Sequence, residues 1–151
     1  MAADVPELTA HLGYWLRQVS NHVSHAFARK VANKDVTVAE WAVMRVLHSK
    51  QRIAPSRLAD EMGMTKGAIS KLADRLISKT LVAREASATD GRAQTLRLTA
   101  RGAQMVPELA ALADRNEAEC FAHLSNEDRS MLARILKETV MQLGITATPI
   151  E

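Results

Sequence analysis

Two short helical patterns followed by two strand patterns occupy residues 55–102, and this order of elements constrains the fold more than any other feature. Pro55 suits a first helical turn, and Gly63 stands where a helix would end in a left-handed residue. Thr65 is a good N-cap for a second helix after a tight turn. The apolar residues of that helix recur at i, i+3, i+4 and i+7 and must face a core: Ile69, Leu72, Ala73 and Leu76.

A β-hairpin is predicted directly after the second helix. Residues 81–83 lead into one strand, and residues 95–98 alternate apolar and polar side chains as a half-buried strand does. Residues 86–93 between them are polar and include one glycine, as a hairpin tip would. Helix, turn, helix and hairpin in this order predict a winged helix-turn-helix, a module that places one helix in the major groove of DNA and the hairpin beside it.

Helical patterns also flank this module, so the expected fold class is mainly α with a small β-hairpin wing (α+β). Helices are expected over residues 8–31, 38–49, 99–123 and 125–143. The first carries apolar residues every three or four positions, and Thr37 with Glu40 matches a capping box at the start of the second. Pro107 should bend or break the third, and Ser125 marks the start of the fourth.

Charge is distributed unevenly along the chain. The 151 residues carry a formal net charge of +3. Residues 53–101 contain nine basic and five acidic residues, which leaves the remainder of the chain with a net charge of −1. A basic middle between near-neutral ends is what a phosphate-binding module on a separate scaffold would look like, although a solvated charged face on an ordinary helical domain would give the same count.

The outer face of the second helix of the module is polar and partly basic. At about 100° per residue it carries Gly67, Ser70, Lys71, Asp74 and Ser78, with Lys66 and Arg75 on its flanks. Hydroxyl and lysine side chains can bond to base edges or phosphates, and the helix N-terminus favours a phosphate. At the hairpin tip, Asp90 can orient Arg92 for entry into a minor groove, where negative potential favours a guanidinium. The alternative is that these are ordinary surface residues.

At this point the chain resembles the MarR family of bacterial transcriptional regulators. The residues that carry the resemblance keep the order and spacing of the family's motifs: Leu58-Ala59, Met62-Gly63-Met64-Thr65, Ser70, Asp74-Arg75-Leu76, Leu81-Val82, Asp90-x-Arg92 and Leu98-Thr99-x-x-Gly102. Two positions depart from the family pattern. Thr80 stands where a glycine commonly closes the recognition helix, which should cost a little stability, and Gly91 replaces a common second basic residue in the wing.

The resemblance implies a homodimeric regulator, most often a repressor, that docks two winged modules on an inverted-repeat operator in double-stranded DNA. It divides the chain into an N-terminal dimerisation helix (1–36), the DNA-binding module (37–100) and C-terminal dimerisation helices (101–151), intertwined as one domain. The flanking helices also carry more apolar surface than one small module can cover. The candidate DNA contacts are Ser56, Arg57, Thr65, Lys66, Gly67, Ser70, Lys71, Arg75, Asp90, Arg92 and Arg97.

Many relatives of this kind bind small aromatic acids or phenols in a cleft between the dimer helices and the DNA-binding part. Residues of the first two helices that could line such a cleft are His11, Trp15, Gln18, His22, Trp41, Met44 and Arg45. The alternative is that the tryptophans and the methionine, which fall at helical spacing, are simply core residues.

Other chemistries find less support in the sequence. Cys120 lies beside Phe121 with Glu117 and Glu119 nearby, surroundings that disfavour a reactive thiolate. His22 and His25 lack an accompanying metal motif, and no phosphate loop, nucleophile elbow or paired carboxylates indicate an enzyme or a cofactor. Without a signal-peptide-like or membrane-spanning run, a cytoplasmic protein with no membrane partner is expected. The alternative function is a winged helix used for protein–protein contact, without sequence-specific DNA binding.

Overall fold

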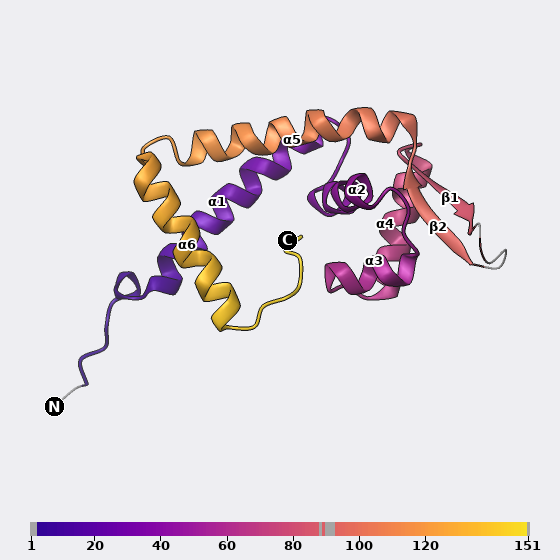
Figure 1. Ribbon diagram of the computed structural model, residues 1–151. Coiled ribbons are helices and arrows are strands. Elements are labelled where there is room, and N and C mark those ends of the chain that lie inside the picture. The colour runs from indigo at the N-terminus through magenta and orange to yellow at the C-terminus, as the bar shows by residue number, and fades with distance from the viewer. Residues whose placement is uncertain (1–2, 88, 90–92, 151) are drawn as a thin grey trace.

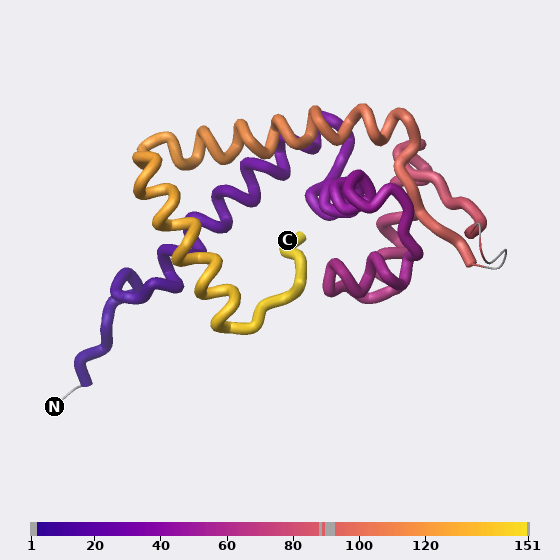
Figure 2. Tube along the Cα trace, viewed as in Figure 1, coloured from indigo at the N-terminus to yellow at the C-terminus, as the bar shows by residue number. Residues whose placement is uncertain are grey.

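The computed structural model describes residues 3–87, 89 and 93–150, and its elements agree with the predicted fold class. In chain order these are η1 (Leu8–Ala10), α1 (Leu12–Ala32), α2 (Val38–Lys50), α3 (Pro55–Met62), α4 (Lys66–Ser78), β1 (Val82–Ala86), β2 (Gln94–Leu98), α5 (Ala100–Cys120) and α6 (Asn126–Gln142). Figure 1 shows α5 running along the top, with α1 and α6 at one end and the winged module of α2, α3, α4, β1 and β2 at the other. The same trace in Figure 2 shows the segment after α6 returning towards the winged module.

The first two helices follow the predicted pattern with two corrections. The helix expected from Leu8 begins only at Leu12, because His11 has an extended backbone and residues 8–10 form a separate 3-10 turn. Thr37 caps α2 by accepting a hydrogen bond from the Glu40 amide at 3.1 Å, as predicted. The Glu40 side chain does not complete a capping box. It is buried and pairs with Lys79 at the end of α4, with 2.9 Å between Nζ and Oε2.

The later helices begin at hydroxyl caps, the second of which, Ser125, was predicted. Thr99 and Ser125 each accept a hydrogen bond from the amide three residues on, at 3.1 Å. Helix α5 continues through Pro107, so the expectation of a break there is wrong. A proline costs a helix one backbone hydrogen bond, and the packing of Val106 and Leu109, both buried, offsets that loss.

The winged module has its predicted structure. Helix α3 ends at Gly63, whose φ of +63° is left-handed, and α4 buries Ile69, Leu72, Ala73 and Leu76. The two strands pair antiparallel, with Val82 opposite Leu98, and Ile53 forms a bridge to Leu96. The core of the chain lies inside this module and against the first half of α5, where Leu58, Met62, Leu81, Val106 and Leu109 are buried.

The distal helices contribute little to this core. Helix α6 has no buried residue, and its apolar side chains are between 36% and 80% exposed. The N-terminal half of α1 likewise leaves Leu12, Trp15, Leu16 and Val19 about half exposed or more. Among the described residues, none of the helices is both long and apolar enough to cross a bilayer.

The end of α4 meets the start of α5 in a junction formed by residues 79–81 and 99–102. The Leu81 carbonyl oxygen lies 2.1 Å from where a Cβ on Gly102 would stand, so only glycine fits without a shift of the backbone. The Thr99 hydroxyl donates to the Thr80 carbonyl at 2.7 Å, and Arg101 donates to the Lys79 carbonyl at 2.9 Å. Thr80 has a φ of +61°, which costs a threonine on the order of 1 kcal/mol that glycine would avoid. Its hydroxyl in turn accepts a hydrogen bond from Arg101 at 2.8 Å.

We predict that Gly102→Ala lowers the free energy of unfolding by about 1–3 kcal/mol, because the added methyl group collides with a backbone carbonyl. The matched control is Gly67→Ala, which also adds a methyl group inside a helix but has no atom within 4 Å of the new Cβ. The control should be neutral or stabilising by up to about 1 kcal/mol. Urea unfolding of both variants at equal protein concentration measures the difference, and equal midpoints would contradict the steric account.

Candidate nucleic-acid interface and the adjoining cleft

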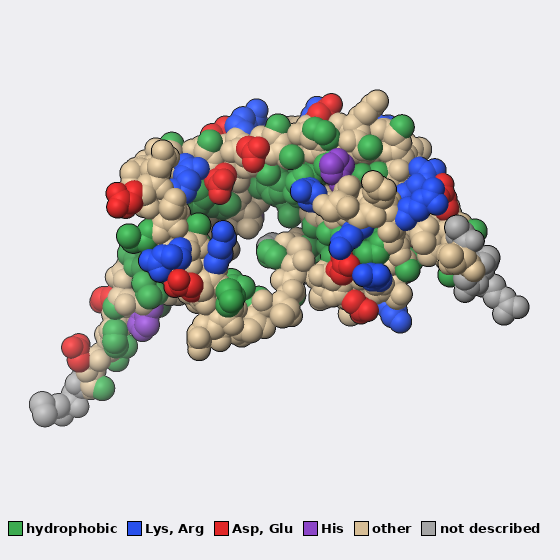
Figure 3. All heavy atoms as spheres, in the orientation of Figure 1, with side chains coloured by type: hydrophobic (Ala, Val, Ile, Leu, Met, Phe, Trp, Pro, Cys, Tyr) green, Lys and Arg blue, Asp and Glu red, His purple; other side chains and the backbone are tan. Residues whose placement is uncertain are grey.

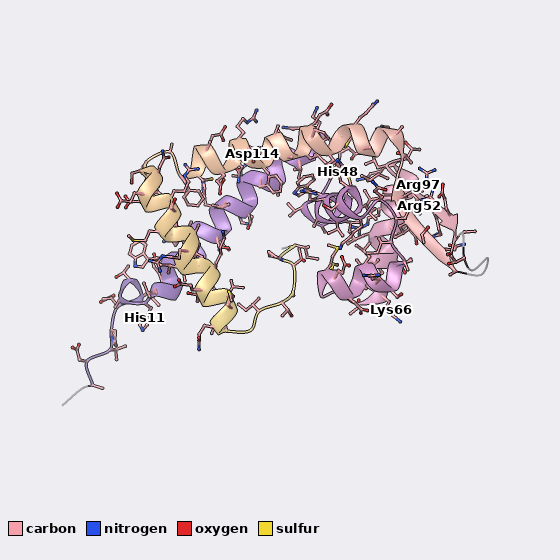
Figure 4. All side chains as sticks on the ribbon, viewed as in Figure 1. His11, His48, Arg52, Lys66, Arg97 and Asp114 are labelled. Atoms are coloured by element: carbon pink, nitrogen blue, oxygen red, sulfur yellow. The ribbon has the colours of Figure 1, made fainter. Side chains whose placement is uncertain are left out.

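The outer face of α4 presents the predicted contact residues to solvent. Lys66, Gly67, Ser70 and Lys71 are all exposed on the first two turns. Thr65 caps the helix by accepting from the Ala68 amide at 3.1 Å. Figure 4 shows Lys66 at the lower edge of the module, pointing away from the protein. The structure therefore brings these residues together on one face, next to the partial positive charge of a helix N-terminus.

Helix α3 adds the two weaker candidates beside this face. Ser56 and Arg57 are exposed in its first turn. Arg57 lies 3.6 Å from a Glu61 carboxylate oxygen, and Lys50 approaches the same oxygen at 3.6 Å. Exposed pairs of this length are weak, so Arg57 remains available to a phosphate. Figure 3 shows Lys and Arg side chains gathered on this lower edge and beside the hairpin.

Arg97 is held inside the hairpin by an ion pair that the sequence analysis did not foresee. Its Nε donates to the Glu85 carboxylate on the paired strand, and its Nη1 donates to the Leu98 carbonyl at 3.0 Å. Arg52 lies 3.4 Å from the other Glu85 oxygen. Figure 4 shows Arg52 and Arg97 close together beside β2. The hydrogen bond from Arg97, with the added charge of Arg52, lowers the pKa of Glu85 below its usual value.

The Asp90-x-Arg92 motif at the tip of the wing lies outside the described residues. The predicted roles of Asp90, Gly91 and Arg92 therefore stay predictions. The hairpin is closed just before them, because the Ser87 amide donates to the Ala93 carbonyl at 2.8 Å.

Two ion pairs connect α4 to neighbouring elements of the module. Arg84 on β1 lies 3.2 Å from the Asp74 carboxylate in the middle of the helix. At its end, Lys79 pairs with the buried Glu40 of α2 and donates to the Asp35 carbonyl at 2.7 Å. The pairing of Glu40 with Lys79 could not be predicted from the sequence. A glutamate three residues after a threonine matches a capping box even when its side chain pairs with a distant lysine.

A cleft of about 640 Å³ separates the winged module from α1 and α5. Its apolar lining includes Val23 and Phe27 of α1, Val38 of α2 and Phe121 after α5, and Arg75 of α4 brings a positive charge to its edge. Arg75, predicted as a DNA contact, is thus exposed but turned towards this cleft on the flank of the recognition helix.

The buried residue Asn116 lines the cleft. Its side chain accepts from Lys30 at 2.9 Å and donates to the Val23 carbonyl at 3.1 Å, which ties α5 to α1. Lys30 also lies 2.9 Å from Glu119, and this hydrogen bond, together with the nearby charge of Arg115, lowers the pKa of Glu119.

None of the seven residues predicted to bind a small ligand lines this cleft. Trp15, Gln18 and His22 line an adjoining hollow of about 400 Å³ together with Cys120, and this hollow shares Val23 and Phe121 with the cleft. His11 is exposed ahead of α1, and Arg45 is exposed and donates to Ser49 at 2.7 Å.

The remaining two ligand candidates serve the core. Met44 is fully buried in it, and Trp41 is half-buried against it. Met44 and Trp41 are therefore core residues, which was the alternative to a ligand-binding role. Among residues 3–87, 89 and 93–150, no three His, Cys, Asp or Glu side chains are grouped as metal ligands would be.

The chain is similar to known regulators in sequence and in fold. The model of the MarR family matches residues 34–93. A protein of Thauera aromatica, described as a transcriptional regulatory protein for the hcr operon, is 27% identical over 89% of this chain and 82% of its own. A cysteine-to-serine variant of E. coli MarR in complex with operator DNA has a TM-score of 0.76 at 24% identity, covering 85% of this chain and 93% of its own.

A second structure resembles the chain over a similar length. It is BpsR of Bordetella bronchiseptica, described in connection with regulation of its DNA binding by 6-hydroxynicotinic acid. Its TM-score is 0.77 at 18% identity, and the match covers 90% of this chain and 97% of that one. Family match, relatives and fold agree with the exposed basic face of α4 beside a β-hairpin. Residues 34–93 therefore match the MarR family, and over most of its length the chain is similar to proteins described as transcriptional regulators and has the winged-helix fold of MarR.

Proposed function

We propose that this chain is a homodimeric repressor that binds an inverted-repeat operator through α4 and the wing. The observation that carries the proposal is the exposed outer face of α4. Lys66, Ser70 and Lys71 extend from its first turns, and no ion pair within the described part of the chain engages either lysine. Solvent-facing lysines and a hydroxyl at a helix N-terminus match the donors that a duplex requires at its phosphates and base edges.

Exposed apolar surface on the distal helices supports the proposal of a homodimer. A groove of about 570 Å³ between α1 and α6 is lined by Leu12, Trp15, Leu16, Leu132 and Leu136. These side chains are between 36% and 81% exposed in the single chain. A contiguous apolar patch of this kind marks an association surface, and a two-fold copy would cover it. Two recognition helices related by a two-fold axis then read half-sites spaced by one DNA turn, roughly 34 Å, or a multiple of it.

The cleft supports control by a small ligand. We propose that it takes an aromatic acid, whose ring packs against Val23, Phe27, Val38 and Phe121 while its carboxylate pairs with Arg75. Such a ligand would touch α1 on one wall and the recognition helix on the other. It changes DNA binding only if it binds two arrangements of these parts with different affinity.

We predict that Lys71→Ala weakens operator binding. If the lysine contacts a base, the loss should be about 1–3 kcal/mol and specificity at that base pair should relax. If it contacts a phosphate, binding to all DNA sequences should weaken to a similar extent. In the second case the slope of log K against log salt should fall by about 1 for each contact removed. Arg92→Ala should also weaken binding by about 1–3 kcal/mol. The matched control is Lys137→Ala, which removes the same charge from exposed α6.

Fluorescence anisotropy with DNA from upstream of the protein's own gene measures all three variants. Equal affinities for Lys71→Ala and wild type would remove α4 from the interface. Failure of the wild type to bind any DNA fragment would favour a winged helix used for protein contact.

We predict that Ile135→Glu dissociates the dimer, because a carboxylate placed in the apolar stripe of α6 would be buried without a partner. Ser130→Glu is the matched control, since Ser130 is exposed on the opposite face of the same helix. Sedimentation equilibrium measures the mass of both variants, and operator affinity should fall with dimerisation. A dimer unaffected by Ile135→Glu would contradict the proposed interface.

We predict that an aromatic acid binds the cleft and that Arg75→Ala weakens its binding about tenfold or more, because a charge-assisted hydrogen bond is lost. Arg45→Ala serves as the control, because Arg45 was a sequence-based candidate but lies outside the cleft. Calorimetric titration with salicylate, benzoate and 6-hydroxynicotinate measures binding. Equal losses in both variants, or no heat with any of the three acids, would count against the proposed ligand.

A further inference from the structure

The segment after α6 gives the distal helices a further connection to the winged module, besides α5 and the link from α1 to α2. Residues 145–150 leave the end of α6 and run back towards α3, as the yellow trace in Figure 2 shows. The Thr148 amide donates to the Met62 carbonyl at 3.1 Å. Met62 is the last residue of α3, where helix carbonyls lack partners within the helix. The segment therefore satisfies an otherwise unpaired group at the turn before the recognition helix.

Close backbone packing reinforces this contact. A Cβ on Gly63 would stand 2.8 Å from the Cα of Ala147 and 3.1 Å from its Cβ. The left-handed backbone of Gly63 already favours glycine, and the approach of Ala147 adds a second reason that is independent of the turn. The turn of the helix-turn-helix is thus shaped to accept this segment.

The same segment forms part of the cleft wall. Pro149 and Ile150 line the cleft together with Val38 and Ala113, and Ile150 is packed against the core. Four consecutive residues therefore connect the two features: residues 147–148 touch the turn that precedes α4, and residues 149–150 line the cleft.

We propose that residues 145–150 act as a strap that couples occupancy of the cleft to the helix-turn-helix. An occupant of the cleft packs against Ile150 and holds Thr148 on Met62, so that the strap ties the winged module to the distal helices in addition to α5 and the connection from α1 to α2. The inference rests on the proposed function only in treating the cleft as a ligand site. The strap contact itself can be tested without DNA.

The physical basis is linkage between two states of the strap. A group in the cleft buries apolar surface against Ile150 only when the strap is docked, so it favours the docked state by that difference in contact. By reciprocity, a strap held on the turn favours the occupied cleft. The cleft volume of about 640 Å³ leaves room for an added ring without expelling the strap.

The test uses a side chain as the occupant. Ala113→Phe places a phenyl group into the cleft from α5, and Ala111→Phe is the matched control because Ala111 is exposed on the same helix outside the cleft. Hydrogen exchange of the Thr148 amide, measured by NMR on the full chain, should slow about fivefold or more in Ala113→Phe and stay unchanged in Ala111→Phe. Ile150→Ala should accelerate the same exchange. Circular dichroism confirms that each variant is folded.

The outcomes separate the strap from the proposed function. Exchange of Thr148 at the rate of an unprotected amide in the wild type overturns the strap, as does an Ala113→Phe variant that matches Ala111→Phe or exchanges faster than the wild type. Should Ala113→Phe not fold, the comparison of Ile150→Ala with wild type decides, and an unchanged rate overturns the proposal. A protected Thr148 in a protein that binds no DNA would refute the proposed function and leave the strap standing.

Discussion

The contact between the Leu81 carbonyl and Gly102 is the constraint on which the rest of the structure depends. It joins the end of the recognition helix to the start of α5, the helix that runs on to the distal part of the molecule. Around it, the Thr99 hydroxyl and the Arg101 guanidinium hold the carbonyls of Thr80 and Lys79. These bonds run from side chains at the start of α5 to backbone carbonyls at the end of α4, and the Thr99 amide donates to the Leu81 carbonyl at 3.1 Å, so the two helix ends are held together. The buried Glu40–Lys79 pair fixes the same end of α4 against α2.

This junction also gives a physical reason for part of the family motif. The pattern Leu98-Thr99-x-x-Gly102 combines a helix cap, a hydroxyl that also donates to the Thr80 carbonyl, and a position where a side chain fits only if the backbone shifts. The departure at Thr80 fits the same account. The left-handed backbone that favours glycine is present, and the threonine hydroxyl gains a hydrogen bond from Arg101 that glycine would lack.

Local patterns in the sequence predicted most of the fold and the exposed part of the site. Caps at Thr37, Thr65 and Ser125, the left-handed Gly63 and the apolar stripe of α4 depend on residues a few positions apart, and all are confirmed. What the sequence could not supply were partners far apart in the chain. Glu40 meets Lys79, Arg97 meets Glu85 across the hairpin, and residues 147–148 meet the end of α3. The residues that line the cleft were predicted wrongly for the same reason, because its walls come from α1, α2, α4, α5 and the segment after α6.

The chain thus combines a polar, basic face at one end with apolar helices at the other, and a cleft and a strap lie between them. The central claim is that a pair of these chains grips duplex DNA with two copies of α4. Hydroxyl-radical footprinting of the purified protein on the DNA upstream of its own gene tests this claim most directly. The account predicts two protected patches related by an inverted repeat, with centres about 10–11 base pairs or a multiple of that apart. A folded dimer that protects no DNA, or protects a single unsymmetrical patch, would contradict it.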